Sequence, residues 1–300
     1  MSESTTPPIA ATPPDLPDGF LPGGRYQEWS PKPPRFVLSD VDGTLLGVDH
    51  DASVVVSTAI AEVVAAGVRL GLATGRTEHA CLPLLEQLGA AGPHVLENGA
   101  QVRQEGTVLA AWPLDPSSLG AIEQIVSAHD LYVEWYLEDG YWASEDRPAA
   151  RAHWKVNRRP PHGFGGPAAF PGARVVRATV VAFASDDVAV IVEALRAEGL
   201  GAGGSTAPAL PGATFINITN PEADKGIGLR AAAAAVGVDP AEVVAIGDGD
   251  NDRPMLAVAG TAIAMGQALP ETKAEAHLIA PEFHAEGAAH AMRAVAGWVR

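Results

Sequence analysis

Apolar residues along the chain fall into short runs that end in polar clusters. Residues 36–38 and 68–73 are two such runs, typical of strands that are buried on both faces of a sheet. Between them, residues 53–66 place apolar side chains at helical spacing. A further helix over 77–88 and a brief strand over 94–96 complete a β-α-β-α-β succession. This succession predicts a parallel sheet covered by helices on both faces.

The last third of the chain repeats this succession, whereas the middle departs from it. The middle holds aromatic-rich strands, a loop rich in proline and glycine, and one clear helix, which is typical of an α+β unit. In the last third we expect strands over 214–219, 243–246, 261–265 and 277–279, and helices over 223–236 and 283–299. In the middle we expect strands over 131–137, 141–142 and 175–184, a loop over 160–172 and a helix over 187–198.

The predicted fold class is α/β, with a Rossmann-like, doubly wound parallel sheet in the core and an inserted α+β cap domain. The core domain comprises residues 35–112 plus 213–300, and the cap comprises residues 113–212. Residues 1–34 contain nine of the 25 prolines and show no helical or strand period, which predicts a flexible tail without a catalytic role. The residues available to anchor the end of this tail on the body are Phe20, Tyr26 and Trp29.

The charge balance limits the partners. The 300 residues include 20 Lys and Arg against 36 Asp and Glu, a net charge of −16, so binding to nucleic acid or to an anionic membrane surface is not expected. The single cysteine, Cys81, can form neither an intramolecular disulfide nor a thiolate metal site. We see no apolar run of the roughly 18 residues that span a bilayer and no secretory signal, so a cytoplasmic location is expected.

The first polar cluster follows the strand at 36–38 and brings two carboxylates together. Asp40 and Asp42 repel each other unless a cation lies between them. Gly43 lets the backbone turn sharply and approach a ligand. The alternative is an ordinary turn with a capping aspartate.

Two further clusters indicate anion binding at helix starts. Thr74, Gly75 and Arg76 offer a hydroxyl and free backbone N–H groups, although ordinary capping uses similar residues. Lys225 falls in the first turn of a predicted helix, where the helix dipole disfavours a cation, so a nearby anion is expected. A solvated surface lysine is the alternative here.

The fourth cluster holds three aspartates within five residues after a buried strand. Asp248, Asp250 and Asp252 together favour a hard cation with oxygen ligands. An EF-hand loop is excluded, because Arg253 stands where that loop requires glycine and Ala259 where it requires a bidentate glutamate. A solvated acidic loop is the remaining alternative.

Taken in order, the four clusters resemble the motifs of the haloacid dehalogenase (HAD) phosphohydrolase superfamily. They read Asp-x-Asp-Gly-Thr, Thr-Gly-Arg, Lys-Gly and Gly-Asp-Gly-x-Asn-Asp. The insert between the second and third clusters resembles the cap of the Cof-type subclass (IIB) in position and size. Residues 97–100 and 247–256 are also similar to that subclass. The resemblance covers residues 35–300 and implies a phosphoric monoester hydrolase that uses Mg²⁺.

The resemblance also implies a role for each site residue. Asp40 would attack phosphorus and form an aspartyl-phosphate; a carboxylate is ionised at neutral pH and needs no activating base. Asp42 would act as general acid and then as general base. Mg²⁺ would be held by Asp40, the backbone carbonyl of Asp42 and Asp248, with Asp252 orienting the metal site. The residues expected to bind the phosphoryl group are Gly43, Thr74, Gly75, Arg76, Lys225 and Asn251.

The expected function is therefore a Mg²⁺-dependent phosphatase acting on a small phosphorylated metabolite, with a sugar phosphate as one candidate. A phosphomutase or phosphotransferase of the same superfamily is the alternative enzyme, and a receiver-type phospho-acceptor domain or an inactive binding module are the non-enzymatic ones. The partner expected is a small-molecule phosphate ester, and the oligomeric state stays open. His129 and His277 are expected to be structural. Candidate substrate contacts in the cap, with burial as the alternative for the aromatic ones, are Glu134, Trp135, Tyr136, Trp142, His153, Trp154, Lys155, Arg158 and Arg159.

Overall fold

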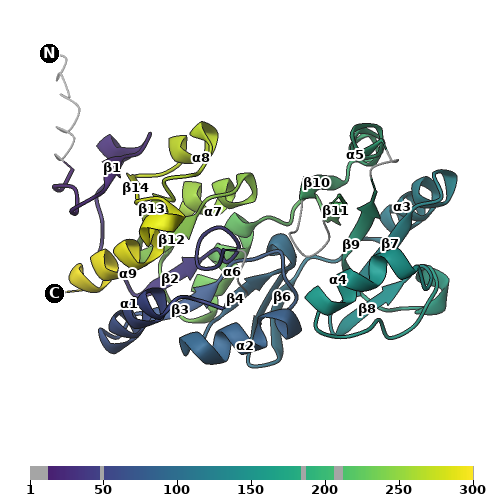
Figure 1. The fold of residues 1–300 in the computed structure, drawn as a ribbon, viewed down its shortest axis with the longest axis horizontal. Coiled ribbons are helices and arrows are strands. Elements are labelled where there is room, and N and C mark those ends of the chain that lie inside the picture. Colours follow the sequence, from purple (N-terminus) through teal and green to yellow (C-terminus); the bar gives the residue numbers. More distant parts are fainter. Residues whose placement is uncertain (1–12, 48–50, 184–186, 206–211, 300) are drawn as a thin grey trace, which may run out of the picture.

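The computed structural model describes residues 13–47, 51–183, 187–205 and 212–299. Within these ranges the chain forms a core domain and a cap that lie next to each other along the long axis of the molecule (Figure 1). The predicted fold class, an α/β core with a parallel sheet and an inserted α+β cap, is confirmed.

A six-stranded sheet organises the core domain. Its strand order is β1-β14-β13-β12-β2-β3, and all neighbours run parallel except the edge strand β1. The non-consecutive order requires helical crossovers on both faces, as in doubly wound folds. The strands are β1 (Leu21–Pro22), β2 (Phe36–Ser39), β3 (Arg69–Leu72), β12 (Val243–Gly247), β13 (Thr261–Ala264) and β14 (Leu278–Ile279).

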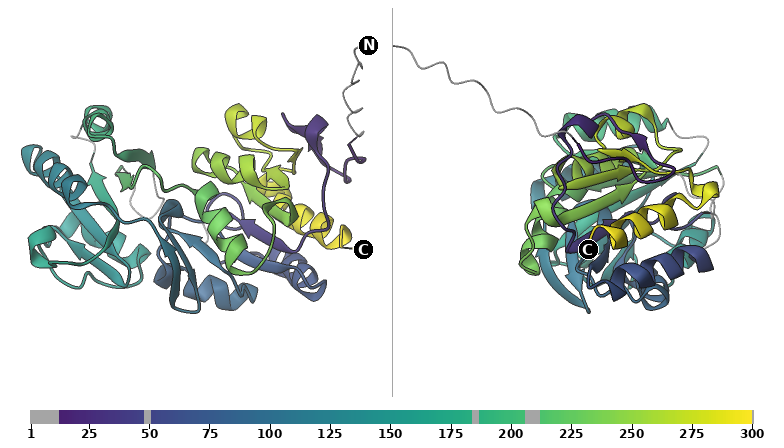
Figure 2. Two further views of the ribbon diagram at one scale, coloured as in Figure 1. Left: turned by 180° about the vertical axis from the view of Figure 1, so that it is seen from behind. Right: turned by 90° about the vertical axis from the view of Figure 1, so that its left-hand side faces the viewer.

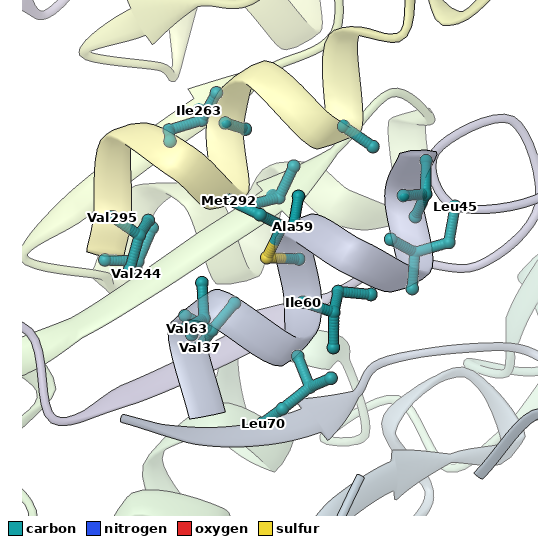
Figure 3. Packing of buried hydrophobic residues seen from close by; sticks show 14 of the residues in the cluster. Val37, Leu45, Ala59, Ile60, Val63, Leu70, Val244, Ile263, Met292 and Val295 are labelled. Carbon is teal, nitrogen blue, oxygen red and sulfur yellow. The ribbon is translucent and has the colours of Figure 1, made fainter. Parts of the chain in front are cut away.

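Both faces of this sheet are buried, which explains why its strands are apolar without interruption. Val37 belongs to a cluster with residues of α1, α2 and α9, and part of that packing is drawn in Figure 3. Phe36 and Leu38 face the other way, against residues of α6 and α7. The end-on view in Figure 2 shows helices on opposite sides of the sheet. The core helices are α1 (Val54–Ala65), α2 (Glu78–Leu88), α6 (Lys225–Ala235), α7 (Arg253–Val258), α8 (Pro270–Ala274) and α9 (Gly287–Gly297).

A small antiparallel sheet lies beside β3. It consists of β4 (His94–Leu96), β5 (Gln101–Gln104) and β6 (Thr107–Ala111), and a parallel bridge between Ala73 and Val95 joins it to the core. The loop between β4 and β5 therefore lies close to the carboxyl end of β3.

The cap is an antiparallel sheet of order β10-β11-β9-β7-β8. Apolar residues of α3 and α5 pack on one face of it. The strands are β7 (Tyr132–Leu137), β8 (Gly140–Ala143), β9 (Val175–Ala182), β10 (Gly201–Ser205) and β11 (Thr214–Thr219); the helices are α3 (Pro116–Ala128), α4 (Arg151–Val156) and α5 (Val188–Ala197). The predicted end of the third cap strand at residue 184 lies outside the described residues.

The strand β11 differs from the sequence-based division, which placed it in the core domain. In the structure it pairs with β9 and β10 of the cap, from Thr214 opposite Ala182 to Thr219 opposite Arg177. The alternation of apolar residues specifies a strand but does not specify its partner. The cap sheet therefore extends to residue 219.

The described part of the predicted tail, residues 13–34, is also packed rather than free. β1 pairs with β14, and Trp29 is 2 % exposed. The Nε1–H of Trp29 donates to Thr261 Oγ1 at 3.1 Å, and the ring lies edge-on to Trp298 with centroids 5.6 Å apart. Phe20, at 6 % exposed, and Trp29 therefore act as the anchors that the sequence offered. The strand β1 was not predicted, because a two-residue edge strand has no readable period. None of the helices in the described ranges is long and apolar enough to cross a membrane.

Candidate active site

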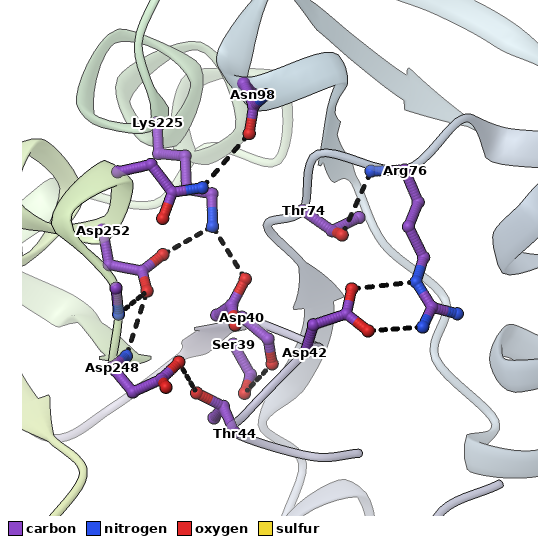
Figure 4. A network of polar contacts seen from close by, with 12 residues as sticks. Ser39, Asp40, Asp42, Thr44, Thr74, Arg76, Asn98, Lys225, Asp248 and Asp252 are labelled. Atoms are coloured by element: carbon purple, nitrogen blue, oxygen red, sulfur yellow. Dashed lines mark hydrogen bonds and ion pairs between the residues drawn. The ribbon is translucent and has the colours of Figure 1, made fainter. Parts of the chain in front are cut away.

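The candidate site lies where parallel strands of the core end. Asp40 follows β2, Thr74 follows β3, and Asp248 follows β12. The carboxyl ends of parallel strands meet at one edge of a sheet, where open α/β folds bind their ligands. Lys225 is the first residue of α6, whose N-cap is Asp224. The four predicted clusters thus come together in space, as Figure 4 shows.

Lys225 is the centre of this arrangement. Its Nζ lies 2.7 Å from Oδ1 of Asp40 and 2.5 Å from Oδ1 of Asp252, and its side chain is fully buried. Burial opposes the charge on Lys225, but the carboxylates of Asp252 and Asp40 raise the pKa of its ammonium group. The lysine therefore stays charged within a buried ion-pair network, and the alternative of a solvated surface lysine is wrong.

The aspartates carry more charge than the lysine neutralises. Burial and the neighbouring charge of Asp252 raise the pKa of Asp40 well above its ordinary value, although Lys225 opposes the shift. Burial and Asp252 likewise raise the pKa of Asp248. A cation bound beside Asp40 and Asp248 would stabilise their charged forms.

The donor set fits a hard divalent ion such as Mg²⁺. Asp40, Asp248 and Asp252 each offer an oxygen within 4.8 Å of the others, and three carboxylates with one ammonium leave a local charge of −3 + 1 = −2. Asp252 is fully buried and already engaged: Oδ2 accepts from the backbone N–H of Asp248 at 3.0 Å and of Gly249 at 2.9 Å. Direct coordination is therefore better suited to Asp40 and Asp248, with Asp252 fixing the loop behind them.

Two residues of the first cluster hold Asp248 in place. The hydroxyl of Thr44 donates to Oδ1 of Asp248 at 3.2 Å. Gly43 has a φ of 87°, and a Cβ there would collide with Oδ2 of Asp248. Glycine is required at this position on both counts.

The side chain of Asp42 lies outside the carboxylate cluster. Its two oxygens accept hydrogen bonds from Nε and Nη2 of Arg76, at 2.9 and 2.5 Å. Arg76 was expected at the substrate phosphate, whereas in the structure it is paired with Asp42. Thr74 Oγ1 accepts from the backbone N–H of Arg76 at 3.2 Å, which fixes the start of this loop.

The loop between β4 and β5 supplies a residue that we did not assign to the site from the sequence. The amide of Asn251 donates to Oδ1 of Asn98 at 3.1 Å, so the loop contacts the fourth cluster. A Cβ at Gly75 would lie 2.8 Å from the same Oδ1 of Asn98, which brings the second cluster equally close. The available signal was an Asn-Gly pair directly after a predicted strand.

Comparison with known proteins identifies the family to which this chain belongs. Residues 37–292 match the family described as haloacid dehalogenase-like hydrolase. The chain belongs to the haloacid dehalogenase-like hydrolase family. It is therefore a hydrolase, and the predicted superfamily and enzyme class are confirmed.

Relatives and solved structures of HAD proteins agree with this assignment. The chain is 29 % identical over 257 residues to a phosphoglycolate phosphatase of Methanopyrus kandleri, which covers 86 % of this chain and 95 % of that protein. It is 27 % identical over 253 residues to an HMP-PP phosphatase of Cronobacter sakazakii, covering 80 % and 87 %. A HAD subclass IIB sugar phosphatase shares the fold with a TM-score of 0.72 and 19 % identity, covering 87 % of this chain and 98 % of that one.

Of the nine cap residues proposed as substrate contacts, four are buried in the cap interior: Glu134, Trp135, Tyr136 and His153. Trp135 is 1 % exposed within the apolar cluster beside α3 and α5. Glu134 is fully buried and accepts from both tyrosine hydroxyls of β7, from Asn157 and from the ring of His153. His153 is therefore not part of one cationic patch with Lys155, which is exposed.

A cavity of about 160 Å³ lies between α2, β5 and the turn of the β7–β8 hairpin. Thr77, Glu97, Gln101 and Arg159 are among its lining residues, and none of the aspartates of the candidate site is. Thr77 directly follows Arg76, and Glu97 directly precedes Asn98. This cavity therefore adjoins the two loops that border the candidate site.

Proposed function

We propose that the chain is a Mg²⁺-dependent HAD phosphatase that hydrolyses a small phosphorylated metabolite through an aspartyl-phosphate on Asp40. The observation that carries the proposal is the shared contact of Lys225 with Asp40 and Asp252, beside Asp248. A buried cation and an excess of carboxylate oxygens together suit a phosphoryl dianion and a metal ion.

Asp40 is the proposed nucleophile. One of its oxygens contacts Lys225, and its side chain is 8 % exposed. The ammonium group of Lys225 stabilises the attacking carboxylate and the oxygens of the phosphoryl group that it approaches. The Asp40–phosphorus bond forms as the bond from phosphorus to the ester oxygen breaks.

Asp42 is the proposed proton carrier. It would donate a proton to the leaving ester oxygen and then take one from the water that attacks the aspartyl-phosphate. A carboxyl group cannot donate a proton while both of its oxygens accept from Arg76. We therefore expect the Arg76 contact to open on at least one oxygen when substrate binds.

The metal would be held by Asp40, the backbone carbonyl of Asp42 and Asp248, with Asp252 orienting the loop. Bound there, Mg²⁺ would reduce the repulsion between an anionic nucleophile and a phosphate dianion. Thr74, Asn251 and the backbone N–H groups around Gly43 and Gly75 would bind phosphoryl oxygens.

The substrate class rests on the relatives and on the cap. Two relatives are named for phosphoglycolate and HMP-PP, and a structural neighbour for sugar phosphates. We propose a small phosphate ester, a sugar phosphate being one candidate, whose leaving group contacts the cap. A phosphomutase of the same superfamily is the second candidate, because it would use the same nucleophile.

Release of inorganic phosphate across a panel of sugar, nucleotide and cofactor phosphates, with Mg²⁺ present, tests the proposal. We expect phosphate release by the wild type, none above background from Asp40→Asn, and loss of activity in excess EDTA. An isomerised sugar phosphate in place of free phosphate would favour the phosphomutase. Full turnover by Asp40→Asn would contradict the nucleophile assignment.

A further inference from the structure

The loop between β4 and β5 has an unusual backbone. Glu97, Asn98 and Gly99 have φ values of 54°, 58° and 98°, three consecutive residues in the left-handed region. For Glu97 and Asn98 this conformation is disfavoured by clashes of the Cβ atom. Such residues persist only where their surroundings hold them, and they are common at functional sites.

This loop contacts the second, third and fourth polar clusters of the site. The backbone N–H of Glu97 donates to the carbonyl of Arg76 at 3.2 Å, and that of Asn98 to the carbonyl of Thr74 at 3.1 Å. Gly99 lies so close to the backbone of Asp224 that a Cβ would collide with its carbonyl group. Asn98 also contacts Asn251. The loop therefore lies against the segments that follow β3 and β12 and against the start of α6.

A residue of the cap holds this loop. Arg177 of β9 places its Nε 2.7 Å from Oε2 of Glu97, and both side chains are less than 10 % exposed. Arg177 is itself held on two sides. Its Nη1 donates to Oδ1 of Asn217 at 2.8 Å, and its guanidinium lies 4.0 Å from the centre of the Tyr136 ring. The cap therefore presents a fixed cation to a strained loop of the core.

We propose that Arg177 is a positioning residue, which through Glu97 keeps the 97–99 loop in its left-handed conformation and so holds Asn98 against the catalytic loops. The proposal rests on the proposed function, since it concerns the same site. It assigns the cap a part in assembling the catalytic centre, in addition to contact with the leaving group. The chain of contacts runs from Tyr136 through Arg177 and Glu97 to Asn98.

The test uses the full chain and a variant that leaves no unpaired buried charge. Arg177→Met with Glu97→Gln removes the ion pair and both charges, so the variant is expected to fold. We expect kcat for phosphate release to fall on the order of 10²-fold, the cost of a small misplacement of catalytic groups. KM is expected to change less than kcat, because the loop acts in positioning rather than in uniform binding.

A control variant breaks a second ion pair between the two domains. Arg103 of β5 contacts Asp139 in the β7–β8 turn at 3.2 Å, and this pair does not involve the 97–99 loop. Asp139→Asn is expected to keep kcat within about twofold of the wild type, because its carboxylate is exposed. An equal loss of kcat in both variants would overturn the proposal, since cap attachment alone would then explain it.

A second measurement does not depend on activity. Hydrogen exchange of the backbone amides of residues 97–100 is expected to quicken at least tenfold in the double variant and to be unchanged in Asp139→Asn. Unchanged exchange and unchanged kcat in the double variant would overturn the positioning role. A wild type that releases no phosphate while the exchange result holds would contradict only the proposed function.

Discussion

Three aspartate side chains lie near one lysine in the candidate site, so negative charge exceeds positive charge there. Asp40 and Asp252 pair with Lys225, whereas Asp248 is held by the Thr44 hydroxyl and forms no ion pair with any residue of the described ranges. The raised pKa values of Asp40 and Asp248 have the same cause, burial with nearby like charge. The residue-scale consequence is a site that gains stability from a bound divalent cation.

Magnesium is therefore expected to stabilise the fold. Thermal unfolding in Mg²⁺ should occur at a higher temperature than in EDTA, by an amount equivalent to about 2.7 kcal/mol at a metal concentration one hundred times Kd. Asp248→Asn should abolish most of this difference, because it removes a carboxylate that has no cation partner. A melting temperature that is indifferent to Mg²⁺ in the wild type would speak against a metal site here.

Asp42→Asn should separate the two halves of the reaction. With p-nitrophenyl phosphate the leaving group needs no proton, so the first turnover should remain fast. Hydrolysis of the aspartyl-phosphate should then slow by roughly 10²- to 10⁴-fold, because the general base is missing. Rapid-quench measurements should show a burst of nitrophenol near one equivalent. A steady rate from the first turnover onward would contradict the proton-carrier role.

The residue types of the site were predictable, but some of their partners were not. Aspartates and a lysine at strand and helix ends indicated a common edge, since parallel strands end together. Asp250, which belongs to the fourth cluster but received no role from the family resemblance, is paired with Arg253 at 3.0 Å and is 82 % exposed. The pairing of Arg76 with Asp42 and the contact of Asn98 with Asn251 depend on side-chain directions, which sequence spacing does not encode.

Two histidines connect strands at the element scale. Nδ1 of His94, in β4, accepts the backbone N–H of Leu72 in β3 at 3.2 Å. Nδ1 of His277, just before β14, accepts the backbone N–H of Ala262 in β13 at 2.9 Å. To accept these hydrogen bonds, Nδ1 of each ring must carry no proton, so both imidazoles are neutral. Burial lowers the pKa of each from 6.5 to about 4, with Arg25 contributing for His277.

These histidines predict a loss of stability in mild acid. Between pH 6.5 and 4 the unfolded chain binds protons that the folded chain does not, so the free energy of unfolding falls as the pH is lowered through this range. His94 contributes up to about 3 kcal/mol of this loss. Urea unfolding at a series of pH values measures it. Below pH 4 both states are protonated and the contribution of His94 stays constant.

His94→Asn is the matched variant for this prediction, since its Oδ1 can accept in place of Nδ1 but does not titrate. The unfolding free energy of the variant should depend less on pH between 4 and 6.5 than that of the wild type. An identical pH dependence in the two proteins would show that His94 is not the source.

The periodicity of the sequence predicted individual strands and helices, but it did not predict which strands pair. The buried strands at 36–38 and 243–246 were recognisable because both faces of the sheet are covered. β11 was recognised as a strand but assigned to the wrong sheet, because its partner β9 lies more than 30 residues away in the sequence. Which sheet a strand joins is decided by contacts that no local pattern carries.

For the molecule as a whole, the segment of residues 13–34 closes one edge of the core sheet. β1 pairs with β14, and Arg25 donates to the carbonyls of Leu256, Ala257 and Glu275. Its proline content suggested a tail because proline removes the backbone donors that a long strand needs. A short strand and a few large side chains suffice to dock it.

Trp29 should therefore be important for stability. Trp29→Ala is expected to reduce the free energy of unfolding by about 3–5 kcal/mol, because a buried indole is lost. Thr261→Val should cost about 1 kcal/mol, the value of the hydrogen bond between the two side chains. Trp29→Phe should cost more than Thr261→Val, because the smaller ring also loses buried packing. Urea denaturation provides the comparison. An unchanged midpoint for Trp29→Ala would mean that this segment does not stabilise the domain.

The chain crosses between the two domains at two neighbouring points. It leaves the core after β6 and returns after β11, and the side-chain amide of Asn220 donates to the carbonyl of Pro113 at 3.0 Å across these crossings. Everything from α3 to β11 is thus attached through one pair of adjacent junctions, and no core strand has to move when that block is replaced. If the cap contacts the leaving group, as proposed, a block from a relative that keeps an arginine at position 177, joined at 113 and 220, is expected to exchange substrate preference in a single recombination step.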